Sequence, residues 1–396
     1  MAGHGPPLTI LIAAHDAAAT IERAVASCLP ERCPIVLADD RSTDGTAGRA
    51  RAAAGGRLRI VRVPDPGGVA RARQRALDAV DTPYAAWLDA DDEWLPGRAS
   101  RLAAMLESGH DVAVEPIDLH DGPTGAWLRR LTVPAYLRGP GGGVRLFERN
   151  HLPGDTQVAF RTEIFREAGG YDPSVCGPES FDVLLRALRT GARLACGDQT
   201  GYRMFAYPGS LSRDLARQRA ALARVLEKHA YDDVRRLYRS AGHSDRIAAW
   251  ALVIIAQFRG DTGAALEYLD VAAPEGGDPH EILEPEGPWP FPEGWRRAFH
   301  RGTILLMQGG LDRDAAEHLH RADAVQETAE CANNLGVALA RLGQRDRARA
   351  LFETAALRCP GYVDAVVNAA ATVPAALTTH PLRRSASRSE YAVARS

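Results

Sequence analysis

The stretch YAAWLDADDEW, residues 84–94, decides how the first half of the chain is expected to fold. Its first part, Tyr84–Leu88, is a short apolar run of the kind that forms a buried strand, and it leads straight into Asp89-Ala90-Asp91. Upstream, similar runs predict three further strands, and the segments between them have helical spacing. The predicted strands are 8–14, 35–38 and 58–63, and the predicted helices are 18–28, 46–54 and 68–80. This alternation is typical of an α/β domain with a parallel, doubly wound sheet.

Two acidic clusters follow predicted strands of this sheet. Asp89 and Asp91 come after the strand at 84–88, and Asp39 ends the strand that begins at Ile35. Parallel sheets bind ligands beyond the carboxyl ends of their strands, where both clusters lie. Because Mg²⁺ and Mn²⁺ bind carboxylates together with substrate phosphates, Asp91 is a candidate metal ligand. For an isolated acidic pair the alternative is a solvated turn or a helix cap, and the second cluster and a basic helix start favour the metal.

That helix start is a glycine pair, Gly67 and Gly68, followed by Arg71 and Arg73. The free N–H groups of a helix start, together with an arginine, are suited to bind phosphate. The glycine pair alone is a weak signal, because the same arginines are equally suited to a solvated helix face.

The strand signals end near Ser212, and the rest of the chain has helical spacing. Its clearest unit, residues 332–360, follows the helix–turn–helix pattern of a tetratricopeptide repeat, with small residues where the two helices touch. Two weaker units contain Gly260 and Gly310 at the corresponding turn. The expected organisation is an α/β domain at 1–212, a connecting helix at 213–245, tetratricopeptide-like repeats at 246–374 with a Pro/Gly-rich insertion at 274–294, and a disordered tail at 375–396.

The composition argues against several classes of protein. With 48 basic and 50 acidic residues, the 396-residue chain has a formal net charge of -2 and lacks the basic excess of a non-specific nucleic-acid binder. It has neither the long apolar run of a membrane span nor, at Met1–Thr9, the features of a signal peptide. Its six cysteines form no CxxC pairs, which argues against a zinc site and a secreted disulfide framework. We therefore expect a cytoplasmic protein with reduced thiols.

Several motifs, in order, resemble those of family 2 glycosyltransferases, which have the GT-A fold. The segments at 12–24, 36–46, 67–77 and 84–94 resemble the nucleotide-binding half, and those at 157–186 and 202–212 resemble the acceptor half. The resemblance covers roughly residues 8–212. It implies an inverting transferase that uses a nucleotide-diphosphate sugar with Mg²⁺ or Mn²⁺.

The resemblance also implies roles for individual residues. Asp39 is expected to meet the base of a UDP-sugar and Arg73 its diphosphate region, while Asp89 and Asp91 meet the ribose and the metal. The expected donor-binding residues are Ala13, His15, Asp39, Arg73, Asp89 and Ala90, with Asp91 as the metal ligand.

Three positions depart from the family pattern. His15-Asp16 replaces the usual Tyr-Asn, and Tyr207 stands where a histidine is expected. The third departure is the most important: Glu179-Ser180 replaces the usual Glu-Asp, so the common aspartate base is missing. Either Glu179 or Asp182 takes that role, or the acceptor is a cysteine thiol, which is far easier to deprotonate than a hydroxyl.

The order of domains is similar to that of sublancin-type peptide S-glycosyltransferases, which carry C-terminal tetratricopeptide repeats. This suggests a peptide or protein acceptor, linked through Cys or Ser/Thr, on a concave helical surface. Alternatively, the repeats form a homodimer or dock the enzyme to an assembly. The rival functions are transfer to a cell-wall or natural-product glycan, and a catalytically inactive scaffold.

Overall fold

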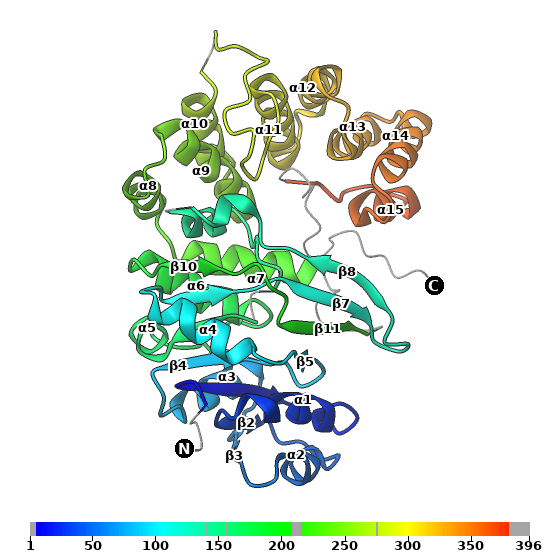
Figure 1. Cartoon of the computed structure of the whole chain (residues 1–396). Helices are drawn as coiled ribbons and strands as arrows, with labels where there is room; N and C mark the ends of the chain where they lie inside the picture. Colours follow the sequence, from blue (N-terminus) through cyan, green and yellow to red (C-terminus); the bar gives the residue numbers. More distant parts are fainter. Residues whose placement is uncertain (1–4, 140, 155–156, 208–214, 275, 380–396) are drawn as a thin grey trace. The chain divides into compact units, whose positions relative to one another are not determined.

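The computed structural model describes residues 5–139, 141–154, 157–207, 215–274 and 276–379 (Figure 1). The chain divides into two compact units, Met1–Val225 and Leu226–Arg384. The boundary falls within helix α7 (Leu215–Glu227). The expected fold class is confirmed: an α/β unit is followed by a unit built from helices.

The N-terminal unit contains, within the described ranges, a seven-stranded sheet with the order β10-β6-β9-β4-β1-β2-β3. β1 pairs in parallel with β2 and β4, and β2 with β3, as predicted. β9 runs antiparallel between β4 and β6, so the sheet is mixed and the expectation of a uniformly parallel sheet is wrong. The chain reaches β9 by way of a second sheet and not through a single crossover helix. The strands are β1 (Leu8–Ala14), β2 (Ile35–Asp39), β3 (Leu58–Arg62), β4 (Tyr84–Trp87), β6 (Val112–Val114), β9 (Ala159–Arg161) and β10 (Leu194–Cys196).

The second sheet has the order β5-β11-β7-β8. Its strands are β5 (Glu93–Trp94), β7 (Ile117–Asp121), β8 (Trp127–Leu131) and β11 (Tyr202–Ala206). The helices of this unit before α7 are α1 (Ile21–Cys28), α2 (Thr46–Ala54), α3 (Val69–Asp78), α4 (Arg98–Glu107), α5 (Thr162–Glu167) and α6 (Glu179–Arg189), with 3₁₀ turns at Leu29–Glu31, Ala135–Leu137 and Gly142–Phe147.

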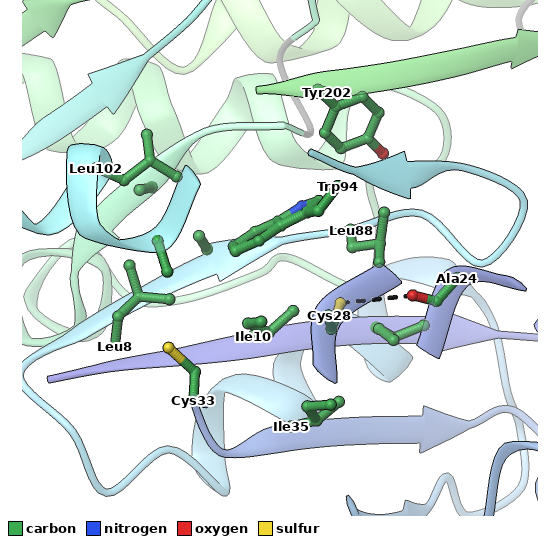
Figure 2. Close-up of a cluster of buried hydrophobic side chains, with 14 of the residues drawn as sticks. Leu8, Ile10, Ala24, Cys28, Cys33, Ile35, Leu88, Trp94, Leu102 and Tyr202 are labelled. Atoms are coloured by element: carbon green, nitrogen blue, oxygen red, sulfur yellow. Dashed lines mark hydrogen bonds between the residues drawn. The ribbon is translucent and has the colours of Figure 1, made fainter. Parts of the chain in front are cut away.

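A buried apolar cluster holds the first strands, their helices and the second sheet together (Figure 2). Leu8 and Ile10 of β1 lie in it with Leu102 of α4, Trp94 of β5 and Tyr202 of β11. Burial of this apolar surface fixes the sheet edge from which the acidic loops emerge. All six cysteines of the chain lie in the described ranges, and none of them forms a disulfide there.

The C-terminal unit consists of helices that pack as consecutive pairs. α9 packs on α10, α11 on α12, and α13 on α14. The predicted single connecting helix at 213–245 is wrong, because α7 and α8 are separated by residues 228–230 and Ala230 has an extended backbone (φ -59°, ψ 144°). The helices are α8 (Tyr231–Ser240), α9 (Asp245–Arg259), α10 (Thr262–Ala272), α11 (Glu293–Gln308), α12 (Asp312–Val325), α13 (Ala329–Arg341), α14 (Arg345–Arg358) and α15 (Val363–Ala370).

Each of these pairs turns at one of the glycines singled out in the sequence. Gly260, Gly310 and Gly343 have φ values of 73°, 75° and 80°, a left-handed conformation that side chains with a Cβ disfavour. The residues 5, 9 and 12 positions after each glycine are all buried against the preceding helix. They are Ala265, Leu269 and Ala272, then Ala315, Leu319 and Ala322, then Ala348, Phe352 and Ala355.

The insertion at 274–294 ends in an aromatic stack. Phe291 stacks on Trp295 with ring centroids 4.1 Å apart, and Trp295 on Phe299 at 4.7 Å. These rings and Trp289 are buried in the core of the helical unit. The aromatic residues therefore pack the insertion onto the helices.

The expected disordered tail begins at residue 375, and residues 375–379 are described. Thr378 is buried and bound by side chains of α13 and α15. The expectation is thus wrong for these five residues, and the rest of the tail lies outside the described ranges. None of the helices in the described ranges combines the length and apolar character needed to cross a membrane.

Candidate active site

The expected donor-binding residues lie at one edge of the large sheet. β1 lies between β4 and β2 and runs parallel to both, so their carboxyl ends meet. Ala13 is at the end of β1, Asp39 ends β2 beside Ala14, and Asp89 follows β4. This edge is where α/β sheets bind their ligands.

A buried arginine joins this edge to helix α6. Arg73 of α3 donates through Nη2 to Asp89 Oδ1 at 3.0 Å and through Nε to Glu179 Oε1 at 3.2 Å. The side chains of Arg73 and Glu179 are 6% and 3% exposed, whereas that of Asp89 is 26% exposed. Residues from three separate segments of the unit thus form one charge network.

Within this network Arg73 is held on three sides. Its guanidinium carbon lies 4.6 Å from the centroid of the Trp87 ring, a cation–π contact. Burial alone lowers the pKa of Arg73, but Asp89 and Glu179 outweigh it and raise the pKa above its ordinary value. Arg73 was expected at the diphosphate region. In the structure it connects two carboxylates.

Glu179 and Asp182, the two candidate bases, have different surroundings. Glu179 is the first residue of α6, and its Oε2 accepts the N–H of Gly177 at 3.0 Å. Asp182 is fully buried, and its Oδ2 accepts from Arg186 Nη2 at 2.7 Å. Arg186 also donates to the carbonyl of Gly170, so Asp182 helps to anchor α6. Glu179 is connected to Asp89 through Arg73.

Three acidic residues, Asp89, Asp91 and Asp92, lie just after the end of β4. Asp92 is buried, where its carboxylate accepts from the hydroxyl of Tyr202 and the N–H of Phe205, both at 2.8 Å. Burial, followed by the charges of Asp89 and Asp91, raises the pKa of Asp92 well above its ordinary value. Asp92 thereby ties β11 to the loop that carries Asp91.

The residues at this loop are compatible with a divalent cation. Asp91 is half-buried and belongs to a concentration of negative charge with Asp89 and Asp92. Mg²⁺ is usually held by one or two carboxylates plus substrate phosphates, a set that Asp91 and a diphosphate supply. In the part of the chain that the structure describes, no group of three or more His, Cys, Asp or Glu side chains forms a metal site by itself.

The loops after β1 and β2 contact each other. His15 is exposed, and its Nδ1 lies 2.6 Å from the carbonyl oxygen of Asp40. Asp39 is buried, with Oδ1 accepting the N–H of Ser42 at 3.1 Å. Asp40 accepts the N–H of Gly68 at 2.8 Å, which places the start of α3 beside this loop.

Two further residues of the site, Gln157 and Arg23, are not among the candidates that the sequence predicts. Gln157 donates to Asp89 Oδ2 at 2.6 Å, so two side chains orient this carboxylate. Arg23 binds the carbonyl of Asp91, pairs with Glu93 at 3.2 Å, and lies 4.0 Å from the Phe205 ring centroid. Both residues lie within quoted motifs, but only three-dimensional proximity shows what they contact.

Part of the first half of the chain is similar to a known protein family. Residues 9–169 match the family described as Glycosyl transferase family 2. Over 220 residues the chain is 34% identical to the succinoglycan biosynthesis protein ExoU of Rhizobium meliloti (strain 1021), covering 51% of this chain and 63% of that protein. Over 225 residues it is 29% identical to ExoO of the same organism, also named a succinoglycan biosynthesis protein, covering 53% and 64%. The chain therefore spans less than two thirds of these relatives.

Structures of S. aureus TarS are among the solved structures that match the chain. The match to TarS has 14% sequence identity and a TM-score of 0.47, and covers 88% of this chain and 55% of that chain. TarS 1-349 in complex with UDP matches with 15% identity and the same score, and covers 88% of this chain and 90% of that chain.

Proposed function

Because its residues 9–169 match the glycosyl transferase family 2, we propose that this chain transfers a sugar from a UDP-sugar to an acceptor with inversion at the anomeric carbon. The observation that carries the proposal is the Asp89–Arg73–Glu179 network. It links the loop expected to hold the donor to the helix expected to receive the acceptor. A reaction between two bound substrates needs such fixed relative placement.

In this proposal the nucleotide lies at the carboxyl ends of β1, β2 and β4. Asp39, buried at the end of β2, accepts the imide N–H of uracil. Asp89, oriented by Arg73 and Gln157, accepts from the ribose hydroxyls. Asp91 holds Mg²⁺ or Mn²⁺, which neutralises charge that develops on the departing diphosphate.

Glu179 acts as the general base. Its carboxylate takes the proton of the acceptor hydroxyl, and the acceptor oxygen forms a bond to the anomeric carbon while the bond to the diphosphate breaks. UDP leaves with the electron pair of that bond. Attack from the face opposite the leaving group inverts the configuration.

Two acceptor classes are supported by different observations. The names of ExoU and ExoO favour a glycan acceptor in polysaccharide assembly, since these relatives are similar to about half of the chain. The second candidate is a peptide side chain, which is favoured by buried asparagines of the helical unit that bind an extended backbone. We place the glycan first because its support comes from sequence relatives with 34% and 29% identity.

The proposal is tested by release of UDP from a panel of UDP-sugars, with GDP-sugars for comparison and with Mg²⁺, Mn²⁺ or a chelator. Asp91→Asn is expected to lower turnover by about 10²-fold or more, because it removes charge from the ion's protein ligand. Asp81→Asn is the matched control, since this exposed acid precedes the opposite end of β4. Near-normal turnover of Asp91→Asn with Mn²⁺ would contradict the metal role.

A further inference from the structure

Three asparagines of the helical unit hold a segment of the chain itself. Asn333 and Asn334 lie on α13 and Asn368 on α15, two helices that pack against each other. All three side chains are buried. We call them the asparagine row. The segment they bind is residues 375–379, which follows α15 and has no helix or strand of its own.

Two asparagines of the row each bind the N–H and the carbonyl of one residue of this segment. Asn334 accepts the N–H of Thr378 at 2.9 Å and donates to its carbonyl at 2.8 Å. Asn368 does the same with Ala376, at 2.9 and 2.8 Å. One carboxamide thus satisfies both backbone groups of a residue, as a neighbouring strand would. Since the two bound residues are two positions apart, the row fits an extended backbone.

One side chain of the segment, that of Thr378, is buried among polar groups. The Thr378 hydroxyl donates to Asp364 Oδ2 at 2.9 Å and is hydrogen-bonded to the Tyr362 hydroxyl. Thr378 is only 1% exposed, and the preceding Leu377 packs against the apolar core. These contacts therefore suit serine or threonine after an apolar residue.

Part of the chain at this segment is open to solvent. Ala375 of the segment is exposed, and Val373, two residues before it, is 75% exposed. The segment is held by backbone groups that every peptide possesses, together with Leu377 and Thr378. In addition, Asn334 and Asn368 are 34 residues apart (368 minus 334), the period of a tetratricopeptide repeat. A periodic set of amides that contacts backbone atoms does not require this particular sequence.

We propose that the asparagine row is a binding site for an extended peptide segment of another protein, in which an apolar residue precedes serine or threonine. Residues 375–379 occupy the site in the free chain and compete with that peptide. The proposal goes beyond sugar transfer, and it stands whether or not the N-terminal unit is active, because binding needs no sugar donor.

The test uses the full chain and a fluorescein-labelled peptide with the sequence of residues 371–379, ATVPAALTT, followed by fluorescence anisotropy. A tethered competitor acts at an effective concentration of about millimolar, so the wild-type chain is expected to bind the probe weakly. Thr378→Pro removes the N–H that Asn334 accepts and the hydroxyl that Asp364 accepts. It leaves the asparagine row intact, and we expect it to bind the probe at least about 10-fold more tightly.

The matched control is Thr372→Pro. Thr372 is exposed, and Ala371 before it already has the extended backbone that a following proline requires (φ -80°, ψ 140°). Thr372→Pro is expected to bind like wild type. Thr378→Pro is called an opening variant, because it is expected to release the segment from the asparagine row. Ala376→Pro, which removes the N–H that Asn368 accepts, is a second opening variant in case Thr378→Pro does not fold.

Specificity is tested with two altered probes, one N-methylated at the residue corresponding to Thr378 and one with valine there. We expect the first to lose binding, because it has no N–H, and the second to bind at least about 10-fold more weakly, because a buried acceptor loses its hydroxyl partner. The proposal is overturned if folded opening variants bind the probe no more tightly than wild type, or if the N-methylated probe binds as well as the parent.

Discussion

The two units of the chain place buried polar side chains in different ways. In the α/β unit they are charged residues from distant motifs, as in the contacts of Arg73 with Asp89 and Glu179. In the helical unit they include neutral amides on successive helices, such as Asn334 and Asn368. Charged pairs give strong, localised fields of the kind that stabilise charge developing on a leaving group such as a nucleoside diphosphate. Neutral amides match a neutral ligand, and the backbone of a peptide is one.

The energetic consequences also differ. A buried ion pair repays the cost of desolvation only when both partners are present, so the loss of one partner is severe. A buried amide that loses its partner costs less, because no net charge is left behind. We therefore expect single substitutions in the Asp89–Arg73–Glu179 network to have larger effects than substitutions in the helical packing.

The largest effect is expected for Glu179→Gln on turnover. Glutamine keeps the oxygen that Arg73 contacts but cannot take a proton at neutral pH. For a hydroxyl acceptor we expect turnover to fall by about 10²–10⁴-fold with little change in UDP affinity, measured by steady-state kinetics and calorimetry. For a thiol acceptor the decrease should be smaller and should diminish as the pH rises toward about 8.5.

Glu163→Gln is the matched control for this variant, because Glu163 is an exposed acid in the first turn of α5. It should have normal turnover. If Glu179→Gln instead lowers the melting temperature and leaves the rate unchanged, Glu179 stabilises α6 and another group is the base.

Arg73→Met is expected to have the next largest effect, on stability. It leaves two carboxylates facing each other without their cation, and the loss of one partner of a buried pair costs about 3–5 kcal/mol. Since Asp89 is 26% exposed, we expect the lower end of this range for the free energy of unfolding in urea. Arg71→Met, on the exposed face of the same helix, should change it by less than about 0.5 kcal/mol. Equal effects of the two variants would show that the network contributes no stability.

Much of the fold could be predicted because it depends on local pattern. Apolar runs place the strands of the N-terminal unit, and the glycine at each turn predicts which later residues face the preceding helix. The antiparallel β9 and the second sheet could not be predicted in this way, since pairing depends on contacts between segments distant in sequence. For the same reason Asp89 and Arg73 could be selected as candidates from motifs, whereas their contacts with Gln157 and Glu179 could not.

The asparagine row was missed for a related reason. Asn333 and Asn334 lie within the repeat unit predicted at 332–360, and the repeat pattern indicates the small residues between its helices, not these asparagines. A tail rich in Ser, Arg and Thr predicts disorder. Nothing in its composition indicates that Thr378 meets Asp364 and the asparagines, because that contact depends on where the chain turns after α15.

The smallest effects concern one substitution, glycine to alanine, made in a helix of each unit. In α13 a Cβ at Gly336 would lie 2.6 Å from Cε1 of Phe352, whose ring is buried, so we expect Gly336→Ala to destabilise the chain by about 1–3 kcal/mol. In α2 a Cβ at Gly48 meets no atom within 4 Å, so Gly48→Ala should stabilise by about 0.5–1 kcal/mol through helix propensity. Both changes are measured by urea unfolding at constant pH. Opposite signs support close helix packing at the predicted small positions of the helical unit, and the same sign in both variants contradicts it.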